Sequence, residues 1–228
     1  MKTTVIIGGS RGIGKATALN ELKKNKVVII SRTSPDFTHE NLIHIACDIL
    51  NDNLPDLESV DSLIYCPGSI NLKPFIRFEI EDFKNDYEIN FLGAVRAIKK
   101  YLPFLKQSMH PSILLFSTVA TKLGMPFHAS IASAKSAVEG LVKSLAAEFS
   151  PTIRINAIAP TVTDTDLASR LLLRNDRMKE QMKERHPLKK YLNPEEIAVM
   201  ASFLISEEAS SMSGQIFQMD CGITTFRV

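Results

Sequence analysis

The sequence predicts a doubly wound α/β domain, in which helices cover both faces of a parallel sheet. Short apolar segments alternate along the chain with longer segments whose apolar residues recur every three or four positions. This alternation is typical of a parallel sheet between two helical layers. The chain has 228 residues, 45% of them hydrophobic, which suits one domain with a sizeable core. We therefore expect a single domain over residues 1–228.

Seven segments are predicted as strands because they are short, apolar and rich in β-branched residues. They are Thr3–Ile7, Lys26–Ser31, Ile43–Ala46, Ser62–Tyr65, Ser112–Phe116, Arg154–Ile158 and Gln215–Met219. About ten residues separate the second strand from the third, and about fifteen separate the third from the fourth. We therefore expect the crossover helices there to be shortened or lost.

Four segments have the apolar spacing of helices. They are Ile13–Lys24, Glu81–Lys106, Ala129–Phe149 and Pro194–Ser206. Pro194 suits the first turn of its helix, where a missing amide donor does no harm. The long second helix is expected to break near Pro103, because proline cannot donate the hydrogen bond of a helix interior.

Composition and charge exclude several classes of function. The formal net charge of +2 is too small to indicate binding to nucleic acid or to a membrane surface. We interpret the locally basic segments 23–26 and 177–190 as solvated helix faces. The sequence contains neither a signal-peptide pattern nor an apolar run of about 18 residues. Cys47, Cys66 and Cys221 have no metal-like spacing, so we expect no metal site and a reducing, cytoplasmic location.

A glycine-rich turn follows the first predicted strand and opens the first predicted helix. Glycines are needed where the backbone turns sharply and lets a pyrophosphate approach, and the helix start supplies free amides and a positive dipole end. The strand–turn–helix context makes this turn a candidate dinucleotide site. The residues of the turn are Gly8-Gly9-Ser10-Arg11-Gly12-Ile13-Gly14.

The end of the second strand indicates which dinucleotide is bound. An acidic residue there would bind the ribose hydroxyls of NAD, whereas arginine accommodates the 2′-phosphate of NADP. Here the acidic position holds Ser31, and Arg32 follows it. Arg11 belongs to the nearby glycine turn, and guanidinium groups bind phosphate well. NADP(H) is therefore favoured, and NAD(H) stays possible.

The order of motifs from Thr3 to Gly222 resembles that of the short-chain dehydrogenase/reductase family. Gly8, Gly12 and Gly14 match its glycine pattern, and residues 130–141 with Lys135 resemble its active-site helix. The resemblance implies a Rossmann-type, seven-stranded parallel sheet in three α/β/α layers. It also implies an NAD(P)(H)-dependent oxidoreductase of the 3-oxoacyl reductase kind, and a homo-oligomer, either a dimer or a homotetramer.

The position of the family's catalytic tyrosine holds Ile131, one helical turn before Lys135. In the family, the lysine binds the nicotinamide ribose and lowers the tyrosine pKa, while the tyrosine protonates the substrate carbonyl. Ile131 can transfer no proton. Because general acid catalysis contributes about 10²–10⁴-fold, we expect slower chemistry but intact cofactor binding.

Two further catalytic roles follow from the resemblance. Thr118 takes the position of the family's serine, which binds the substrate carbonyl, and Ser117 is the substitute if the register differs by one residue. Asn90 matches the asparagine that kinks the long helix and holds a water of the proton relay.

The resemblance also implies cofactor contacts outside the glycine turn. Asp48 would contact the adenine ring, although it equally suits a simple turn. Gly68 keeps the glycine of the turn after strand four, and Pro160 lies in the turn after strand six, where Thr161 replaces a glycine. Thr165 matches a threonine that contacts the phosphates or the carboxamide.

Three explanations are open for the missing proton donor. His128 lies at the spacing at which enoyl-acyl-carrier-protein reductases place their tyrosine, so enoyl reductase-like chemistry is one alternative. A water held by Asn90, Lys135 and Thr118 is another. Third, the protein is a dinucleotide-binding pseudoenzyme that serves as a sensor or a partner subunit.

The substrate is expected to be a small carbonyl or acyl compound. Residues of about 161–192 are expected to form a lid over it, and the apolar lid residues have helical spacing and weakly favour an apolar substrate. These residues are Leu167, Leu171, Leu172, Leu173, Met178 and Met182.

Overall fold

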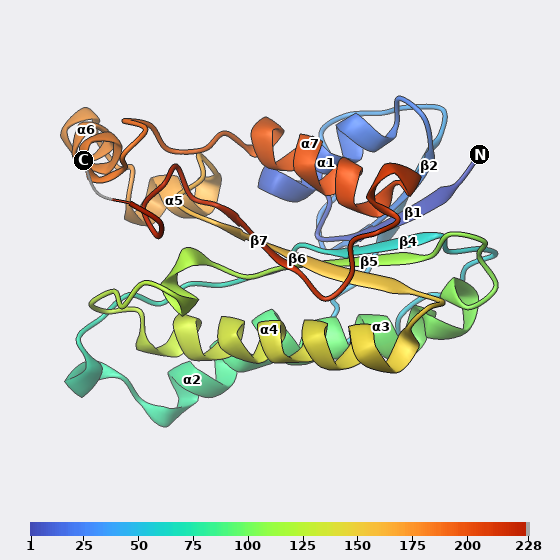
Figure 1. The fold of residues 1–228 in the computed structure, drawn as a ribbon, viewed down its shortest axis with the longest axis horizontal. Helices are drawn as coiled ribbons and strands as arrows, with labels where there is room; N and C mark the ends of the chain where they lie inside the picture. The colour runs from blue at the N-terminus through green and yellow to red at the C-terminus, as the bar shows by residue number, and fades with distance from the viewer. Residues whose placement is uncertain (227–228) are drawn as a thin grey trace.

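The computed structural model describes residues 1–226 and shows a three-layer α/β/α domain (Figure 1). Its seven strands form one parallel sheet in the order β3-β2-β1-β4-β5-β6-β7. The predicted fold class is thereby confirmed. The strands are β1 (Thr3–Ile7), β2 (Lys26–Ser31), β3 (Leu42–Ala46), β4 (Ser62–Tyr65), β5 (Ser112–Phe116), β6 (Arg154–Pro160) and β7 (Ile216–Met219).

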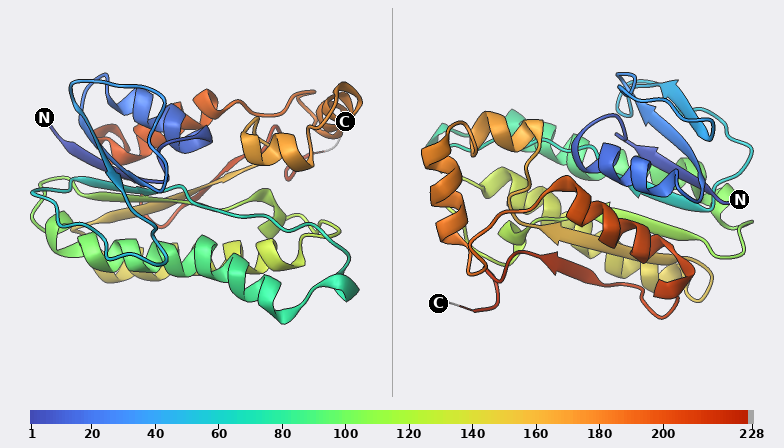
Figure 2. Two further views of the ribbon diagram at one scale, coloured as in Figure 1. Left: turned by 180° about the vertical axis from the view of Figure 1, so that it is seen from behind. Right: turned by 90° about the horizontal axis from the view of Figure 1, so that it is seen from above.

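Two groups of helices cover the two faces of the sheet (Figures 1 and 2). On one face, α1 (Gly12–Glu21) packs beside α7 (Pro194–Ile205). On the other face lie α2 (Ile80–Tyr87), α3 (Gly93–Leu105) and α4 (Ala129–Phe149). The sheet is therefore doubly wound.

Two shorter helices lie beyond the carboxyl ends of the strands (Figure 1). They are α5 (Asp166–Leu171) and α6 (Asp176–Arg185), and both belong to the segment that follows β6. An isolated bridge between Thr163 and Leu192 closes the base of this segment. The chain thus leaves the sheet after β6 and rejoins it only at β7, after α7.

The long helix is interrupted at a different place from the one expected. A π-helical turn over Glu88–Leu92 separates α2 from α3. Pro103 lies inside α3, which continues to Leu105. The prediction of a break at Pro103 is wrong, because the proline sits in the last turn and removes a single amide there. The interruption instead surrounds Asn90, as the family resemblance implied.

Other boundaries differ by a few residues. Helix α1 ends at Glu21 and not at Lys24, because the amides of Lys24 and Asn25 both donate to the carbonyl of Glu21. Strand β6 continues to Pro160, two residues beyond the expected end. Within residues 1–226, no helix lies between β2 and β3 or between β3 and β4, which confirms the expected loss of these crossovers.

The core has two parts, one on each side of the sheet. Successive residues of a strand point to opposite faces. Leu63 accordingly belongs to the part beneath α3 and α4, and Ile64 belongs to the part beneath α1 and α7. Both side chains are fully buried. Continuous apolar strands are therefore required, since neither face of the sheet meets water.

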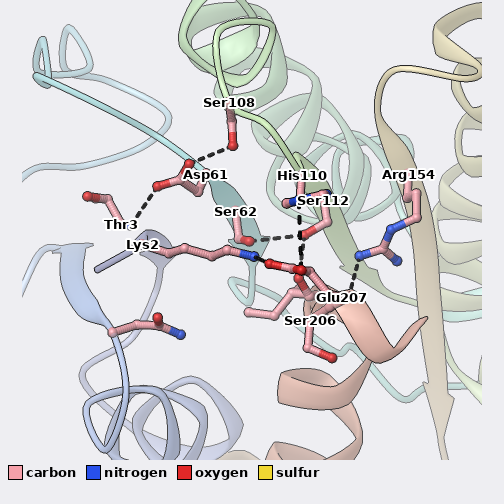
Figure 3. A network of polar contacts seen from close by, with 12 residues as sticks. Lys2, Thr3, Asp61, Ser62, Ser108, His110, Ser112, Arg154, Ser206 and Glu207 are labelled. Carbon is pink, nitrogen blue, oxygen red and sulfur yellow. Dashed lines mark hydrogen bonds and ion pairs between the residues drawn. The ribbon is translucent and has the colours of Figure 1, made fainter. Parts of the chain in front are cut away.

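Polar side chains at the amino end of the sheet bond to one another and to nearby backbone (Figure 3). Asp61 accepts from the Thr3 amide at 2.8 Å and from the Ser108 hydroxyl at 2.5 Å. Arg154 donates to the carbonyls of Leu204 and Ser206, each at 2.8 Å. This end of the molecule satisfies its own polar groups.

Candidate active site

The glycine turn packs too closely against its neighbours to admit side chains. A Cβ on Gly14 would lie 2.3 Å from the carbonyl oxygen of Gly8. Gly8 and Gly12 have φ angles of +76° and +52°, which favour glycine. Arg11 is the N-cap of α1, and it makes no side-chain cap hydrogen bond within residues 1–226. The first amides of α1 therefore remain available to an anion.

A groove of about 560 Å³ runs from this turn across the carboxyl ends of the first strands. Ten of the residues predicted to contact the cofactor line it. They are Gly8, Ser10, Arg11, Gly12, Ile13, Gly14, Arg32, Asp48, Gly68 and Thr165. Sequence reasoning missed Arg170 of α5, which lines the same groove and lies within the segment interpreted as a lid.

Positive charge dominates the part of the groove beside β2. Arg11 and Arg32 both line it. Ser31, at the position that would carry an acidic residue, donates from its hydroxyl to the Thr33 carbonyl at 2.9 Å. Asp48 accepts from the Leu50 amide at 3.0 Å, and this bond is the main reason that its pKa is lowered. Asp48 therefore forms a turn and lines the groove at once.

Lys135 lies behind the groove, beside Gly68. A Cβ on Gly68 would lie 3.0 Å from Asn90 Oδ1 and 3.9 Å from Lys135 Nζ. Burial lowers the pKa of Lys135 from 10.5 to about 8, and the charges of Cys66 and Asp86 oppose this only in part. The chain is therefore tightly packed at Gly68, between the groove and the buried amine.

Asn90 and Asp86 each bring an unpartnered oxygen to this place. The Asn90 side-chain amide donates to the Asp86 carbonyl at 2.8 Å and to Ser69 Oγ at 3.1 Å. Among residues 1–226, Asn90 Oδ1 and Asp86 Oδ2 are buried without a hydrogen-bond partner. Buried polar oxygens are normally paired, so these two indicate a site for water or ligand.

Tyr65 holds the π-helical turn against the sheet. Its hydroxyl donates to the Ile89 carbonyl at 2.7 Å. A Cβ on Gly93 would lie 2.1 Å from the same hydroxyl oxygen, so glycine is required there. Tyr65 is almost fully buried, and burial raises its pKa. Its contacts place it in support of Asn90 and away from the substrate side.

A second, mostly apolar cavity of about 190 Å³ adjoins the groove, and Thr165 and Leu167 line both. The apolar residues of α5 and α6 form one wall of the cavity, as expected for Leu167, Leu171, Leu172 and Met182. Leu173 is buried, and Met178 does not line the cavity. Pro160, predicted to contact the cofactor, lines this cavity and not the groove.

Residues 8–224 match the family model described as enoyl-(acyl carrier protein) reductase. Many solved structures are similar over nearly the whole chain. Aldohexose dehydrogenase of Thermoplasma acidophilum has a TM-score of 0.91 and 26% identity. The match covers 99% of this chain and 95% of the aldohexose dehydrogenase chain. A Francisella tularensis protein described as a short chain dehydrogenase has a TM-score of 0.89 and 26% identity. The match covers 99% of this chain and 100% of the Francisella chain. The chain belongs to the short-chain dehydrogenase/reductase family.

Curated members of this family give the same result. The 3-oxoacyl-[acyl-carrier-protein] reductase FabG of Thermotoga maritima is 27% identical over 97% of each chain. A Tyr-to-Phe variant of ElxO with NADPH bound is 25% identical, with a TM-score of 0.89 and 99% coverage of both chains. The family resemblance is thereby confirmed, and the chain is an oxidoreductase of this family by relationship. None of its described helices is long and apolar enough to cross a membrane.

Ile131, predicted to take the place of the family's tyrosine, forms part of the cavity wall. Ile131 is 4% exposed, lies on α4 one turn before Lys135, and lines the cavity. The hydroxyl pair Ser117 and Thr118, which follows β5, lines the same cavity. Ser117 donates to Glu139 Oε1 at 2.5 Å, so its proton is committed. Thr118 is half-buried and lines the same cavity, which favours it over Ser117 as a ligand for a substrate oxygen.

Two histidines line the cavity, and sequence reasoning found only one. His128 Nδ1 lies 2.7 Å from the Pro126 carbonyl at the start of α4. His186, at the end of α6, is 1% exposed, and its Nε2 lies 2.6 Å from Thr161 Oγ1. His186 lies in a polar stretch of the sequence. The available signal was Thr161, where the resemblance implied a glycine.

Proposed function

We propose that the protein binds NADPH in the groove and reduces the carbonyl group of a small 3-oxoacyl-type compound in the adjoining cavity. The observation that carries the proposal is the pair Arg11 and Arg32 beside β2, with Ser31 where an acidic residue would exclude a 2′-phosphate. The 3-oxoacyl reductase activity for which the FabG relatives are named and the NADPH bound to ElxO support it.

The residues of the groove fit the cofactor. The glycine turn leaves no room for a Cβ on Gly14, and the amides at the start of α1 suit a pyrophosphate. Lys135 points its amine toward Gly68, where a ribose hydroxyl would satisfy it. When bound, NADPH supplies the hydride. The protein orients the substrate oxygen through Thr118 and excludes water from the apolar cavity.

The apolar lining favours an acyl chain or another apolar group beside the reacting carbonyl. Leu167, Leu171, Leu172 and Met182 line the cavity together with Ile131. Such walls bind apolar groups by burying them, but they distinguish poorly between ligands that differ only in a polar group. We therefore propose a 3-oxoacyl thioester as the first substrate to test. A family of this kind also suggests a dimer or tetramer, which light scattering after size-exclusion chromatography tests.

The first experiment is a fluorescence titration of the protein with NADPH and with NADH. We expect NADPH to bind at least ten-fold more tightly, since the arginine pair contributes charge-assisted hydrogen bonds to the 2′-phosphate. Arg32→Ala should reduce the NADPH affinity and leave the NADH affinity unchanged. Lys84→Ala, on the exposed face of α2, is a matched control that also loses one positive charge. Equal binding of both nucleotides would contradict the assignment of NADPH.

A second candidate function is a dinucleotide-binding pseudoenzyme that acts as a sensor or partner subunit. The aliphatic side chain of Ile131, at the place from which the family delivers its proton, favours it. The two functions differ in turnover: the reductase oxidises NADPH when a 3-oxoacyl thioester is present, and the pseudoenzyme only binds NADPH.

Enoyl reduction with His128 as the acid is a third candidate, favoured by the presence of His128 in the cavity lining. It predicts faster NADPH oxidation with a 2-enoyl thioester than with a 3-oxoacyl thioester of the same length. It also predicts that His128→Ala lowers this rate. An unchanged rate in His128→Ala removes the residue from the mechanism.

A further inference from the structure

A hydrogen-bonded threonine–histidine pair lines the cavity in which we place the substrate. Thr161 follows β6 directly, and His186 follows the last residue of α6. Both line the cavity, and they are 7% and 1% exposed. Thr161 Oγ1 and His186 Nε2 are 2.6 Å apart, and His186 Nδ1 lies 2.6 Å from the carbonyl oxygen of Met182.

The hydrogen bonds fix the positions of the protons. A carbonyl oxygen only accepts, so Nδ1 of His186 carries a proton and donates to Met182. In the neutral imidazole, Nε2 is therefore unprotonated and accepts the hydroxyl proton of Thr161. When the imidazole takes up a second proton, Nε2–H donates to Thr161 Oγ1. The hydroxyl proton of Thr161 is then free to turn toward a ligand in the cavity.

The end of α6 holds the ring of His186 in place. The residue caps the carboxyl end of α6, where the helix dipole is negative, and its ring satisfies one of the last free carbonyls of that helix. Two other positions in the cavity wall offer no free proton. Ile131 has no proton, and the proton of Ser117 is committed to Glu139.

We propose that Thr161 and His186 supply the proton that the family's tyrosine would otherwise deliver, with Thr161 in contact with the substrate and His186 behind it. The inference rests on the proposed reductase function. Hydride from NADPH forms the new C–H bond at the carbonyl carbon, and NADPH is oxidised to NADP⁺. The carbonyl oxygen takes the proton of Thr161, Thr161 takes the Nε2 proton of His186, and neutral His186 regains a proton from water.

Replacing Thr161 by valine removes the hydroxyl and keeps the shape. With NADPH and a 3-oxoacyl thioester, we expect Thr161→Val to lower kcat about 100-fold while KM and NADPH affinity change less than about 3-fold. His186→Gln keeps a hydrogen-bond donor near Thr161 but cannot carry the proton, so it should lower kcat to the same extent. The double variant should be no slower than either single variant, because the two residues act in one relay.

Thr4→Val is the matched control. Thr4 is a buried threonine at the amino end of β1, and its hydroxyl donates to Glu21, far from the cavity. This variant should keep the wild-type kcat, and thermal melts of all variants confirm folding. Wild-type kcat in Thr161→Val or in His186→Gln would overturn the proposal.

The Ile131→Tyr background separates this inference from the proposed function. A tyrosine there delivers its own proton, so Thr161→Val should lower kcat less than about 3-fold in that background. If Ile131→Tyr reduces the thioester and the wild-type protein does not, the pair delivers no proton and the inference is overturned. If neither protein binds or oxidises NADPH, the reductase function itself is wrong and the inference falls with it.

Discussion

The two ends of the sheet treat their polar groups in opposite ways. At the amino end, Asp61 and Arg154 are surrounded by partners from distant parts of the chain. At the carboxyl end, oxygens of Asp86 and Asn90 are buried without a partner among residues 1–226, and the amine of Lys135 is buried beside them. Because an unpaired buried polar group costs stability, the second arrangement indicates that a ligand or water completes it.

The difference shows which end stabilises the fold and which end serves function. Open α/β sheets bind ligands outside the carboxyl ends of their strands, where loops can carry chemistry without disturbing the core. The groove, the cavity and all residues proposed to act on the substrate lie there. The amino end can therefore be altered to change stability alone, and the carboxyl end can be altered to change function, even with a gain in stability.

The largest expected effect is at the amino end. Arg154→Met should lower the free energy of unfolding by about 4 kcal/mol, because it leaves several backbone carbonyls without a donor. Urea denaturation measures the change, and NADPH affinity should stay within about two-fold of wild type. A loss below about 1 kcal/mol would contradict the view that this network holds the end of the sheet together.

Lys135→Met should have the opposite effect and raise the free energy of unfolding near pH 7. The folded protein lowers the pKa of Lys135 from 10.5 to about 8, so the unfolded chain binds this proton more tightly. Wild-type stability should therefore rise as pH increases from about 8 to 10.5. Near pH 7 the variant should be more stable by about 3 kcal/mol, and the difference should shrink over that range.

Urea denaturation of the Lys135→Met variant at pH 7 and at pH 10 checks this prediction. The same variant should bind NADPH about ten-fold more weakly, because the ribose loses its charged partner. Lower stability of Lys135→Met at pH 7 would show that the amine already has its partners in the free protein.

Ile131→Tyr should raise the rate of ketone reduction about 100-fold, equivalent to about 2.7 kcal/mol of barrier, because it adds a general acid to the cavity that Thr118 also lines. Steady-state oxidation of NADPH with a 3-oxoacyl thioester measures it. Ile131→Phe is the control, since it adds a similar ring without the hydroxyl. An equal rate in both variants would show that the site cannot use a proton donor at this position.

The smallest expected effects concern the π-helical turn. Tyr65→Phe should lower the free energy of unfolding by about 1 kcal/mol, through the lost bond to the Ile89 carbonyl. Gly93→Ala should lower it by about 2 kcal/mol, because the new methyl group meets the Tyr65 hydroxyl. The loss in the double variant should be smaller than the sum of the two single-variant losses, and urea denaturation can detect this difference. Strict additivity would mean that Tyr65 and Gly93 are not coupled.

Periodicity and turn chemistry predicted most of the fold from the sequence. All seven strands were found to within two residues at each end, and α4 was found without error, because buried apolar runs and long helices are strong signals. Local pattern misplaced the helix interruption at Pro103, and only the family resemblance pointed to Asn90. The interruption at Asn90 is accompanied by tertiary contacts that no local pattern encodes, from Tyr65 to the Ile89 carbonyl and from Asn90 to Ser69.

The groove was easier to predict than the cavity. Its residues come from one contiguous turn and from strand ends, so position along the chain was enough to bring Gly12, Arg32 and Asp48 together. The cavity draws His186 from the end of a short helix, twenty-five residues after its partner Thr161. Thr161 was visible as a departure from the family resemblance, but only the three-dimensional structure could show its contact with His186.

Hydrogen–deuterium exchange with and without NADPH tests the difference between the two ends most directly. NADPH should slow exchange of the amides in residues 8–14, 31–33 and 66–70, because these line the groove or flank Lys135. Amides around Asp61 and Arg154 should exchange at the same rate in both conditions. Unchanged exchange in the glycine turn, or protection confined to the amino end, would contradict a cofactor site at the carboxyl ends of the strands.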